Sequence, residues 1–171
     1  MVGDAKVQTN QTRPKGHSLQ ETLACLALGS NQGDRRAYLE NAIEAISSIS
    51  GCHLDLRSKI YETSPWGVED QPNFLNAVCG LYCSISPRTL LTELQKIEMA
   101  GGRTRQLKWG PRTLDIDIIC FGDIEMNITE LRLPHPLFKE RRFVLEPLAE
   151  IYPQLVIDNL SVLTHLNNLD R

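Results

Sequence analysis

Two aspartates separated by a single residue carry the strongest chemical signal in the chain. Asp115 and Asp117 lie in the segment 114–119, whose alternating pattern predicts a β-strand. Residues two apart in a strand point to the same face, so the two carboxylates should lie roughly 6–7 Å apart and repel each other. Mg²⁺, which combines carboxylate ligands with substrate phosphates and water, would relieve that repulsion. Taken alone, the pair also fits two solvated aspartates on the outer face of a sheet.

A cluster of positive charge directly precedes this strand. Four basic residues occur there with no acidic residue among them: Arg103, Arg105, Lys108 and Arg112. The glycines at 101 and 102 would let the segment move as a lid. Guanidinium groups bind phosphate oxygens, so arginines beside paired carboxylates indicate phosphoryl transfer. A solvated basic loop is the alternative interpretation of the charges alone.

The chain has no Walker-type phosphate loop. The segment Gly29-Ser-Asn-Gln-Gly33 lacks the lysine of that motif and predicts a tight turn between a strand and a helix. A nucleotide would therefore be held by side chains and metal.

Two further stretches offer groups that suit a flat polar ring and a phosphate. Phe74 and Asn76 alternate onto one face of an extended segment, which combines an aromatic plate with an amide that both donates and accepts hydrogen bonds. An ordinary core phenylalanine and an asparagine bonded to backbone is the alternative. The stretch 133–143 contains His135 and Arg141, and the histidine fits either a structural role or a phosphate contact.

The elements that must position these residues are four strands and two helices. Apolar runs and alternation predict strands at 23–28, 54–60, 74–85 and 114–119. Asp34 should cap a helix that ends at Gly51, and Ser86-Pro87 should begin a second helix that ends at Gly101.

This β-α-β-β-α-β order is that of a ferredoxin-like core, an α+β fold. A hairpin is expected beyond Gly122, followed by a short C-terminal helix near residues 160–166. Residues 1–21 are polar and are predicted to be a disordered leader, and residues 22–171 are predicted to form a single domain.

Composition limits the possible classes of protein. The 171 residues are 42% hydrophobic and 23% charged, which predicts a folded core, and the net charge of −3 argues against a broad nucleic-acid-binding face. The five cysteines contain no Cys-x-x-Cys pair and are predicted to be free and mostly buried. With no signal-peptide core or membrane span in the sequence, we expect a cytoplasmic protein.

The chain resembles the 6-hydroxymethyl-7,8-dihydropterin pyrophosphokinase family of folate biosynthesis over about residues 23 to 158. The resemblance rests on motifs in order and spacing: Gly29-Ser-Asn31, Tyr61-x-Thr63-x-Pro65, Gln71-Pro-x-Phe-Leu-Asn76, Gly102-Arg-x-Arg105, Trp109-Gly-Pro-Arg-Thr-Leu-Asp-Ile-Asp117, Pro134-His-Pro136 and Arg141-x-Phe-Val-Leu145. It implies transfer of a pyrophosphoryl group from ATP, the co-substrate, to the hydroxymethyl oxygen of a pterin, with release of AMP. It also implies two Mg²⁺ ions, a monomer, and small molecules rather than nucleic acid or membrane as partners.

The resemblance also implies roles for individual residues. The catalytic group would be Arg103, Arg112, Asp115 and Asp117, with the two aspartates as the metal ligands. The pterin-binding group would be Thr63, Phe74, Asn76 and Phe143. The nucleotide-binding group would be Gln95, Glu98, Arg105, Trp109, His135 and Arg141.

Two other functions remain open on the residues alone. Another Mg²⁺-dependent transferase could use the same Asp-x-Asp pair and would release ADP or pyrophosphate instead of AMP. Ferredoxin-like domains also bind RNA, although the acidic chain and the lack of the usual sheet aromatics disfavour this.

Overall fold

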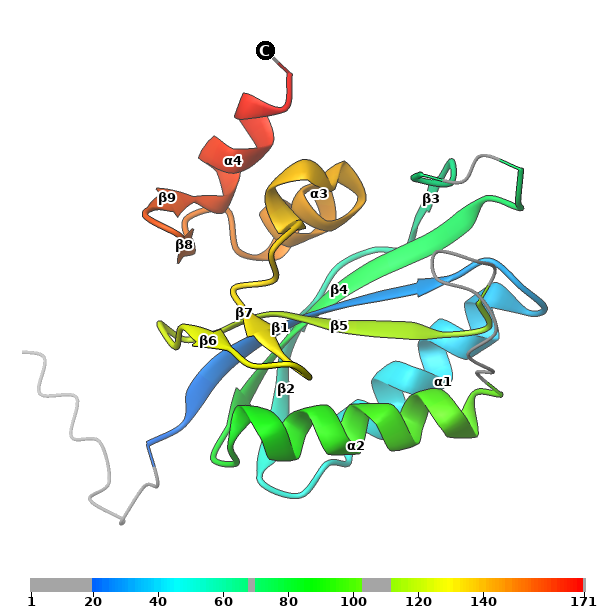
Figure 1. The fold of residues 1–171 in the computed structure, drawn as a ribbon. Coiled ribbons are helices and arrows are strands. Elements are labelled where there is room, and N and C mark those ends of the chain that lie inside the picture. The colour runs from blue at the N-terminus through cyan, green and yellow to red at the C-terminus, as the bar shows by residue number, and fades with distance from the viewer. Residues whose placement is uncertain (1–19, 68–69, 103–111, 171) are drawn as a thin grey trace, which may run out of the picture.

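The computed structural model describes residues 20–67, 70–102 and 112–170. Within these parts the chain forms a layered α+β structure around one antiparallel sheet (Figure 1). The sheet order is β2-β4-β1-β5, and β3 also pairs with β4. The strands are β1 (Thr22–Ser30), β2 (Cys52–Arg57), β3 (Tyr61–Thr63), β4 (Phe74–Cys83) and β5 (Asp115–Phe121).

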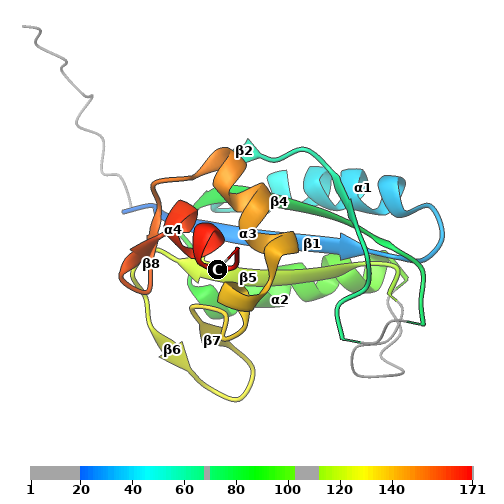
Figure 2. The same cartoon turned by 90° about the horizontal axis from the view of Figure 1, so that it is seen from above.

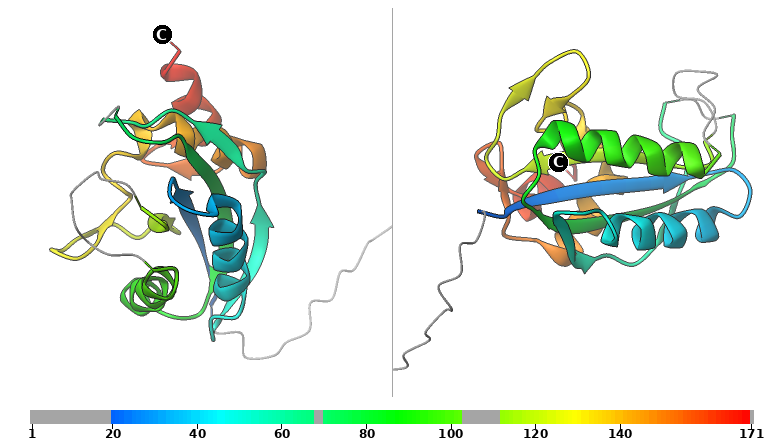
Figure 3. Two further views of the ribbon diagram at one scale, coloured as in Figure 1. Left: turned by 90° about the vertical axis from the view of Figure 1, so that its right-hand side faces the viewer. Right: turned by 90° about the horizontal axis from the view of Figure 1, so that it is seen from below.

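Two helices cover one face of this sheet. They are α1 (Arg35–Ser47) and α2 (Pro87–Ala100), and Figure 3 shows both on the same side of the sheet, running roughly along the strands. Asp34 Oδ1 accepts the N–H of Ala37 at 3.1 Å, and Ser86 Oγ accepts that of Thr89 at 3.1 Å, so both predicted helix starts are confirmed. The order of the elements is ferredoxin-like, as predicted.

The helix α1 ends earlier than the sequence predicts. Its last residue is Ser47, and the N–H of Ser48 already bonds back to the carbonyl of Ala45. Gly51, with a φ of 79°, belongs to the following turn into β2. Serine hydroxyls that bond to nearby carbonyls favour such helix ends, and the apolar pattern does not reveal them.

The second strand is also shorter than predicted, because β2 ends at Arg57 and not at Ile60. The register between β2 and β4 shifts between Leu54 and Leu56. This bulge leaves Leu56 43% exposed, although simple alternation would place it with Leu54 against the core.

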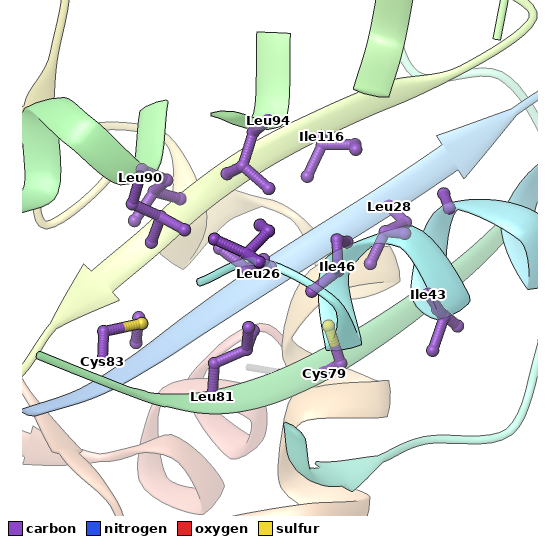
Figure 4. Close-up of a cluster of buried hydrophobic side chains, with 14 of the residues drawn as sticks. Leu26, Leu28, Ile43, Ile46, Cys79, Leu81, Cys83, Leu90, Leu94 and Ile116 are labelled. Atoms are coloured by element: carbon purple, nitrogen blue, oxygen red, sulfur yellow. The ribbon is translucent and has the colours of Figure 1, made fainter. Parts of the chain in front are cut away.

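The larger core cluster lies between the sheet and the two helices. Figure 4 shows Leu26 and Leu28 of β1 packed among apolar side chains from both helices and the neighbouring strands. Cys79 is fully buried in this cluster, and burial raises the pKa of its thiol to about 12. All five cysteines are free, and four of them are buried, which confirms the predicted structural role.

A second layer covers the opposite face of the sheet and was only partly predicted. Figure 2 shows α3 and α4 lying above the strands. Sequence patterns predict the hairpin and the last helix but not α3, whose first residues they indicate only as part of the site. The elements of this part are β6 (Met126–Asn127), β7 (Arg132–Leu133), η1 (Phe138–Glu140), α3 (Arg142–Ile151), β8 (Val156–Ile157), β9 (Leu160–Ser161) and α4 (Val162–Asn168).

The chain after α3 packs closely against the sheet at Gly80. The Tyr152 hydroxyl donates to Asp55 Oδ2, and its ring lies where a side chain at Gly80 would stand. A Cβ at Gly80 would lie 2.1 Å from Tyr152 Oη. None of the described helices is long and apolar enough to cross a membrane.

Candidate active site

A pocket opens on the α3 side of the sheet, where β1 ends and where β4 and β5 begin. Eight of the residues singled out in the sequence line it together: Thr63, Phe74, Asn76, Arg112, Asp115, Asp117, Arg141 and Phe143. They come from β3, β4, β5, the segment before β5, and the start of α3. Groups that are up to 80 residues apart in the chain therefore share one site.

The two aspartates line the pocket from the same face of β5, as their alternation predicts. Asp115 pairs in register with Gly29 and Asp117 with Ala27 of β1, while Ile116 between them points into the core. Each carboxylate has a guanidinium partner. Arg112 forms an ion pair with Asp115, and Arg141 Nη1 donates to Asp117 Oδ2 at 3.1 Å.

Asp117 has an unusual proton affinity for a carboxyl group. Burial raises its pKa to about 6, and the neighbouring charge of Asp115 adds to the increase. The guanidinium groups of Arg141 and Arg112 act in the opposite direction. The charge of this carboxylate is therefore poorly solvated and only partly stabilised by the arginines, and a bound cation would stabilise it further.

His135 lies beside this pair of charges without lining the same pocket. Its Nε2 is 3.6 Å from Asp117 Oδ2, and its Nδ1 accepts the N–H of Leu137 at 3.1 Å. Burial, aided by the charge of Arg141, lowers its pKa to about 4. The ring is thus neutral near pH 7.

The other half of the pocket is built on the pairing of β3 with β4. Thr63 is opposite Phe74 in register, and Asn76 Nδ2 donates to Thr63 Oγ1 at 2.7 Å. Asn76 is only 5% exposed. Gly29 lies against both β4 residues, since a Cβ there would lie 3.1 Å from Asn76 Oδ1 and 3.7 Å from the Phe74 ring. The sequence pattern placed Phe74 and Asn76 on one face, and the structure confirms it.

Aromatic side chains gather where this half meets the charged half. Trp66 and Phe143 form an edge-to-face pair with ring centroids 6.4 Å apart. The guanidinium carbon of Arg141 lies 5.4 Å from the Trp66 ring and 5.7 Å from the Phe143 ring. These cation–π contacts hold Arg141 between the rings and Asp117.

Three residues that lie in or beside the pocket have no site role predicted from the sequence. Trp66 and Gln71 line it, and Asn31 lies directly behind it with hydrogen bonds to both of its halves. All three fall inside or next to the quoted motifs, so motif membership was the available signal. Their contacts are between distant segments, which local patterns do not show.

The structure describes only some of the residues that are expected to bind the nucleotide. Glu98 on α2 is buried, and its Oε1 accepts the N–H of Ile116 at 2.8 Å, so it supports the backbone between the two aspartates. Gln95 lies half-buried on the same helix. Arg103, Arg105 and Trp109 lie outside the described residues, as do the leader residues 1–19.

The carboxylate pair fits a divalent metal site of the kind that is shared with a substrate. Among the described residues no group of three or more His, Cys, Asp or Glu side chains converges to hold an ion. Two neighbouring carboxylates supply hard oxygen ligands, and Mg²⁺ commonly completes such a set with phosphate oxygens and water. Asp115 and Asp117 are the residues that would hold it.

The fold and the pocket together define a class of protein: a ferredoxin-like α+β domain with a small-molecule site suited to phosphoryl transfer. The sequence profile of the 7,8-dihydro-6-hydroxymethylpterin-pyrophosphokinase (HPPK) family matches residues 25–153. The chain belongs to this family.

Curated relatives agree with this assignment. The chain is 44% identical over 149 residues to a 2-amino-4-hydroxy-6-hydroxymethyldihydropteridine pyrophosphokinase of Methylorubrum extorquens, covering 87% of this chain and 94% of the relative. A Bacillus subtilis protein of the same name is 45% identical over 133 residues, or 78% of this chain and 80% of the relative. Folic acid synthesis protein fol1 of Pneumocystis carinii is 39% identical over 155 residues, or 90% of this chain and 21% of that protein.

Solved structures support the fold independently. Plasmodium falciparum HPPK-DHPS with pterin and p-hydroxybenzoate superposes with a TM-score of 0.68 at 14% identity, covering 90% of this chain and 44% of that chain. The chain thus spans less than half of that longer protein. At this identity the likeness concerns the fold, and it agrees with the ferredoxin-like order of the strands.

Proposed function

We propose that this protein transfers pyrophosphate from ATP to 6-hydroxymethyl-7,8-dihydropterin, giving AMP and the pterin diphosphate, as a step of folate biosynthesis. The observation that carries the proposal is the composition of one pocket. Paired carboxylates and arginines lie on one side of it, and an aromatic ring with a buried amide lies on the other. Membership of the HPPK family supports the same activity.

The pterin half suits a flat heterocycle with polar edges. Phe74 and Phe143 come from β4 and α3 and both line the pocket, which supports stacking of the ring between them. Asn76 and Thr63, already joined by a hydrogen bond, would bond to the polar edge of the ring. A buried amide that binds a matching edge discriminates strongly, because a wrong edge would leave it unsatisfied.

The phosphate half suits the triphosphate of ATP. When bound by Asp115 and Asp117, Mg²⁺ would neutralise phosphate charge and make phosphorus more electrophilic. Arg112 and Arg141 lie beside the same carboxylates and would bind phosphate oxygens at that place. Arg103, Arg105, Trp109 and His135, with Gln95 and Glu98, would complete the nucleotide side.

In the proposed reaction the hydroxymethyl oxygen of the pterin attacks the β-phosphorus of ATP. The new oxygen–phosphorus bond forms while the bond from this phosphorus to the oxygen that bridges it to the α-phosphorus breaks. The hydroxyl proton is released and AMP leaves. The residues contribute by positioning and charge stabilisation, so no covalent intermediate on the protein is required.

We further propose two Mg²⁺ ions per site and a monomer that acts in the cytoplasm on small molecules, without nucleic acid or membrane partners. The monomer is supported by the site itself, since described residues of one chain supply both halves of the pocket.

Product analysis tests the proposal. Purified protein is incubated with ATP, Mg²⁺ and 6-hydroxymethyl-7,8-dihydropterin, and the adenine nucleotides are separated by chromatography. We expect AMP that depends on the pterin and disappears when a chelator removes the metal. ADP in place of AMP would contradict pyrophosphoryl transfer, and AMP formed equally without metal would contradict the metal site.

A further inference from the structure

Asn31, immediately after β1, joins the two halves of the pocket through its side chain. It is 2% exposed. Its Oδ1 accepts the N–H of Arg112 at 2.8 Å, and its Nδ2 donates to Gln71 Oε1 at 3.0 Å and to the carbonyl of Pro72 at 3.1 Å. Both ends of one amide are therefore engaged, each with a different loop.

The first of these loops positions the phosphate half. The register of β1 with β5 ends at the pair Gly29 and Asp115. Beyond it, the N–H of Asn31 donates to the carbonyl of Arg112 at 3.0 Å, in addition to the bond to its side chain. Arg112 is thus fixed by two bonds to Asn31, and its guanidinium is the partner of Asp115.

The second loop positions the pterin half. Gln71 and Pro72 directly precede β4, whose first residue, Phe74, lines the pocket. Gln71 lines the pocket as well. A displacement of this loop would break the bonds from Asn31 Nδ2 and leave a buried amide group without its acceptors, which is unfavourable.

We propose that Asn31 is a positioning residue that couples the two substrate sites. Ordering of the loop at Gln71 and Pro72 by a pterin favours the amide orientation that also holds Arg112, and ordering of Arg112 by a phosphate group favours the loop. Because coupling is reciprocal, each substrate then raises the affinity for the other. This inference rests on the proposed function, since it requires a pterin and a nucleotide as the two ligands.

The experiment measures this coupling by titration calorimetry. The dissociation constant of 6-hydroxymethyl-7,8-dihydropterin is determined with and without a non-hydrolysable ATP analogue and Mg²⁺, and the ratio is the coupling factor. For the unmodified protein we expect a factor of roughly tenfold or more. In Asn31→Ala we expect a factor below about threefold, while the affinity for the analogue alone changes little.

Two further variants keep the test decisive if Asn31→Ala folds poorly. Asn31→Asp has the same shape and keeps the acceptor for Arg112 but cannot donate to Gln71 or Pro72, so it too should lose the coupling. Gln71→Ala removes one of the two acceptors and should reduce the coupling partly, with no additional loss when combined with Asn31→Ala. Asn41→Ala, an exposed position on α1, is the matched control and should keep the full factor.

The outcomes separate this inference from the proposed function. Pterin-dependent AMP from the unmodified protein, together with unchanged coupling in both Asn31 variants, would overturn the role of Asn31 alone. A coupling factor near one in the unmodified protein would do the same. Absence of AMP from the unmodified protein would overturn the proposed function itself. If Asn31 had only a structural role, its substitution would weaken the binding of each ligand alone, or the fold, and would leave the coupling factor unchanged.

Discussion

At the scale of single residues, the balance of charge around β5 determines what the site can bind. Two carboxylates face two guanidinium groups, yet burial and mutual repulsion still raise the pKa of Asp117 to about 6. A cation placed between the carboxylates would remove this repulsion. A triphosphate that arrives with such a cation would also bring negative charge for Arg112 and Arg141 to neutralise.

The first prediction concerns Asp117→Asn, which removes this charge without changing the shape of the side chain. We expect AMP formation to fall at least about 100-fold, since metal and transition-state charge would both lose a partner. The fold should persist, because the buried repulsion with Asp115 is also relieved. AMP assays and urea denaturation measure the two effects. Asp123→Asn, in the exposed turn after β5, is the control; near-normal turnover in Asp117→Asn would refute the metal assignment.

A second prediction follows from the raised pKa of Asp117. In the proposed metal site the ionised form would be the ligand, so protonation below a pKa of about 6 would compete with the metal. We expect Mg²⁺ to bind the free protein about tenfold more weakly at pH 5 than at pH 7. The sign is opposite for stability without metal: the folded protein binds this proton more tightly, so protonation stabilises it as the pH falls from 7 toward 4. Metal titrations at both pH values measure the effect, and a pH-independent affinity would exclude the assignment.

At the scale of secondary-structure elements, β5 needs support because it is an edge strand. One of its N–H groups, that of Ile116, bonds to Glu98 Oε1 at 2.8 Å instead of to another strand. The helix α2 thereby holds β5 at the residue between Asp115 and Asp117, the two proposed metal ligands. Glu98, which the resemblance assigns to the nucleotide site, therefore also supports the backbone of β5.

The third prediction tests this contact with paired variants. Glu98→Ala leaves the buried N–H of Ile116 without its acceptor and should lower the free energy of unfolding by about 1–3 kcal/mol. Glu98→Gln keeps an acceptor of the same length and should cost less than about 1 kcal/mol. Urea denaturation measures both. Equal destabilisation by the two variants would show that the hydrogen bond to β5 is not what matters.

Local sequence signals predicted most of the elements that carry the site. Ser86-Pro87 and Asp34 identified the two helix starts, because capping depends on a few neighbouring residues. The bulge that exposes Leu56 was missed, because it depends on how β2 meets β4. The helix α3 is not predicted, because the motif around Phe143 indicates a binding site and no helix start, and because Pro147 lies within the helix.

At the scale of the whole molecule, the larger core cluster and the pocket lie on opposite faces of the sheet. The helices α1 and α2 bury the larger core on one face, and α3 brings Arg141 and Phe143 to the pocket on the other. Tyr152, directly after α3, packs on Gly80, and this contact helps to fix the position of the helix. Sequence patterns predicted the members of the pocket on β4 and β5. They did not reveal that Trp66 lines the pocket or that Asn31 lies behind it, since those contacts form only when distant segments pack.

A fourth prediction tests this docking of the C-terminal part. In Gly80→Ala the new methyl group would overlap the Tyr152 ring, so the ring would have to move and lose its bond to Asp55. We expect a loss of about 1–3 kcal/mol in the free energy of unfolding. Combined with Tyr152→Ala, the same change should cost much less. Additive costs in the double variant, measured by urea denaturation, would show that the overlap is not the cause.

The most direct test of the proposed activity is to follow the phosphorus atoms themselves. Phosphorus-31 NMR of a reaction with ATP, Mg²⁺ and 6-hydroxymethyl-7,8-dihydropterin distinguishes a diphosphate ester from a monophosphate ester. We predict two mutually coupled phosphorus signals on the pterin product, formed together with the single signal of AMP. One uncoupled phosphate on the pterin, formed together with ADP, would contradict pyrophosphoryl transfer and assign the same pocket to an ordinary kinase.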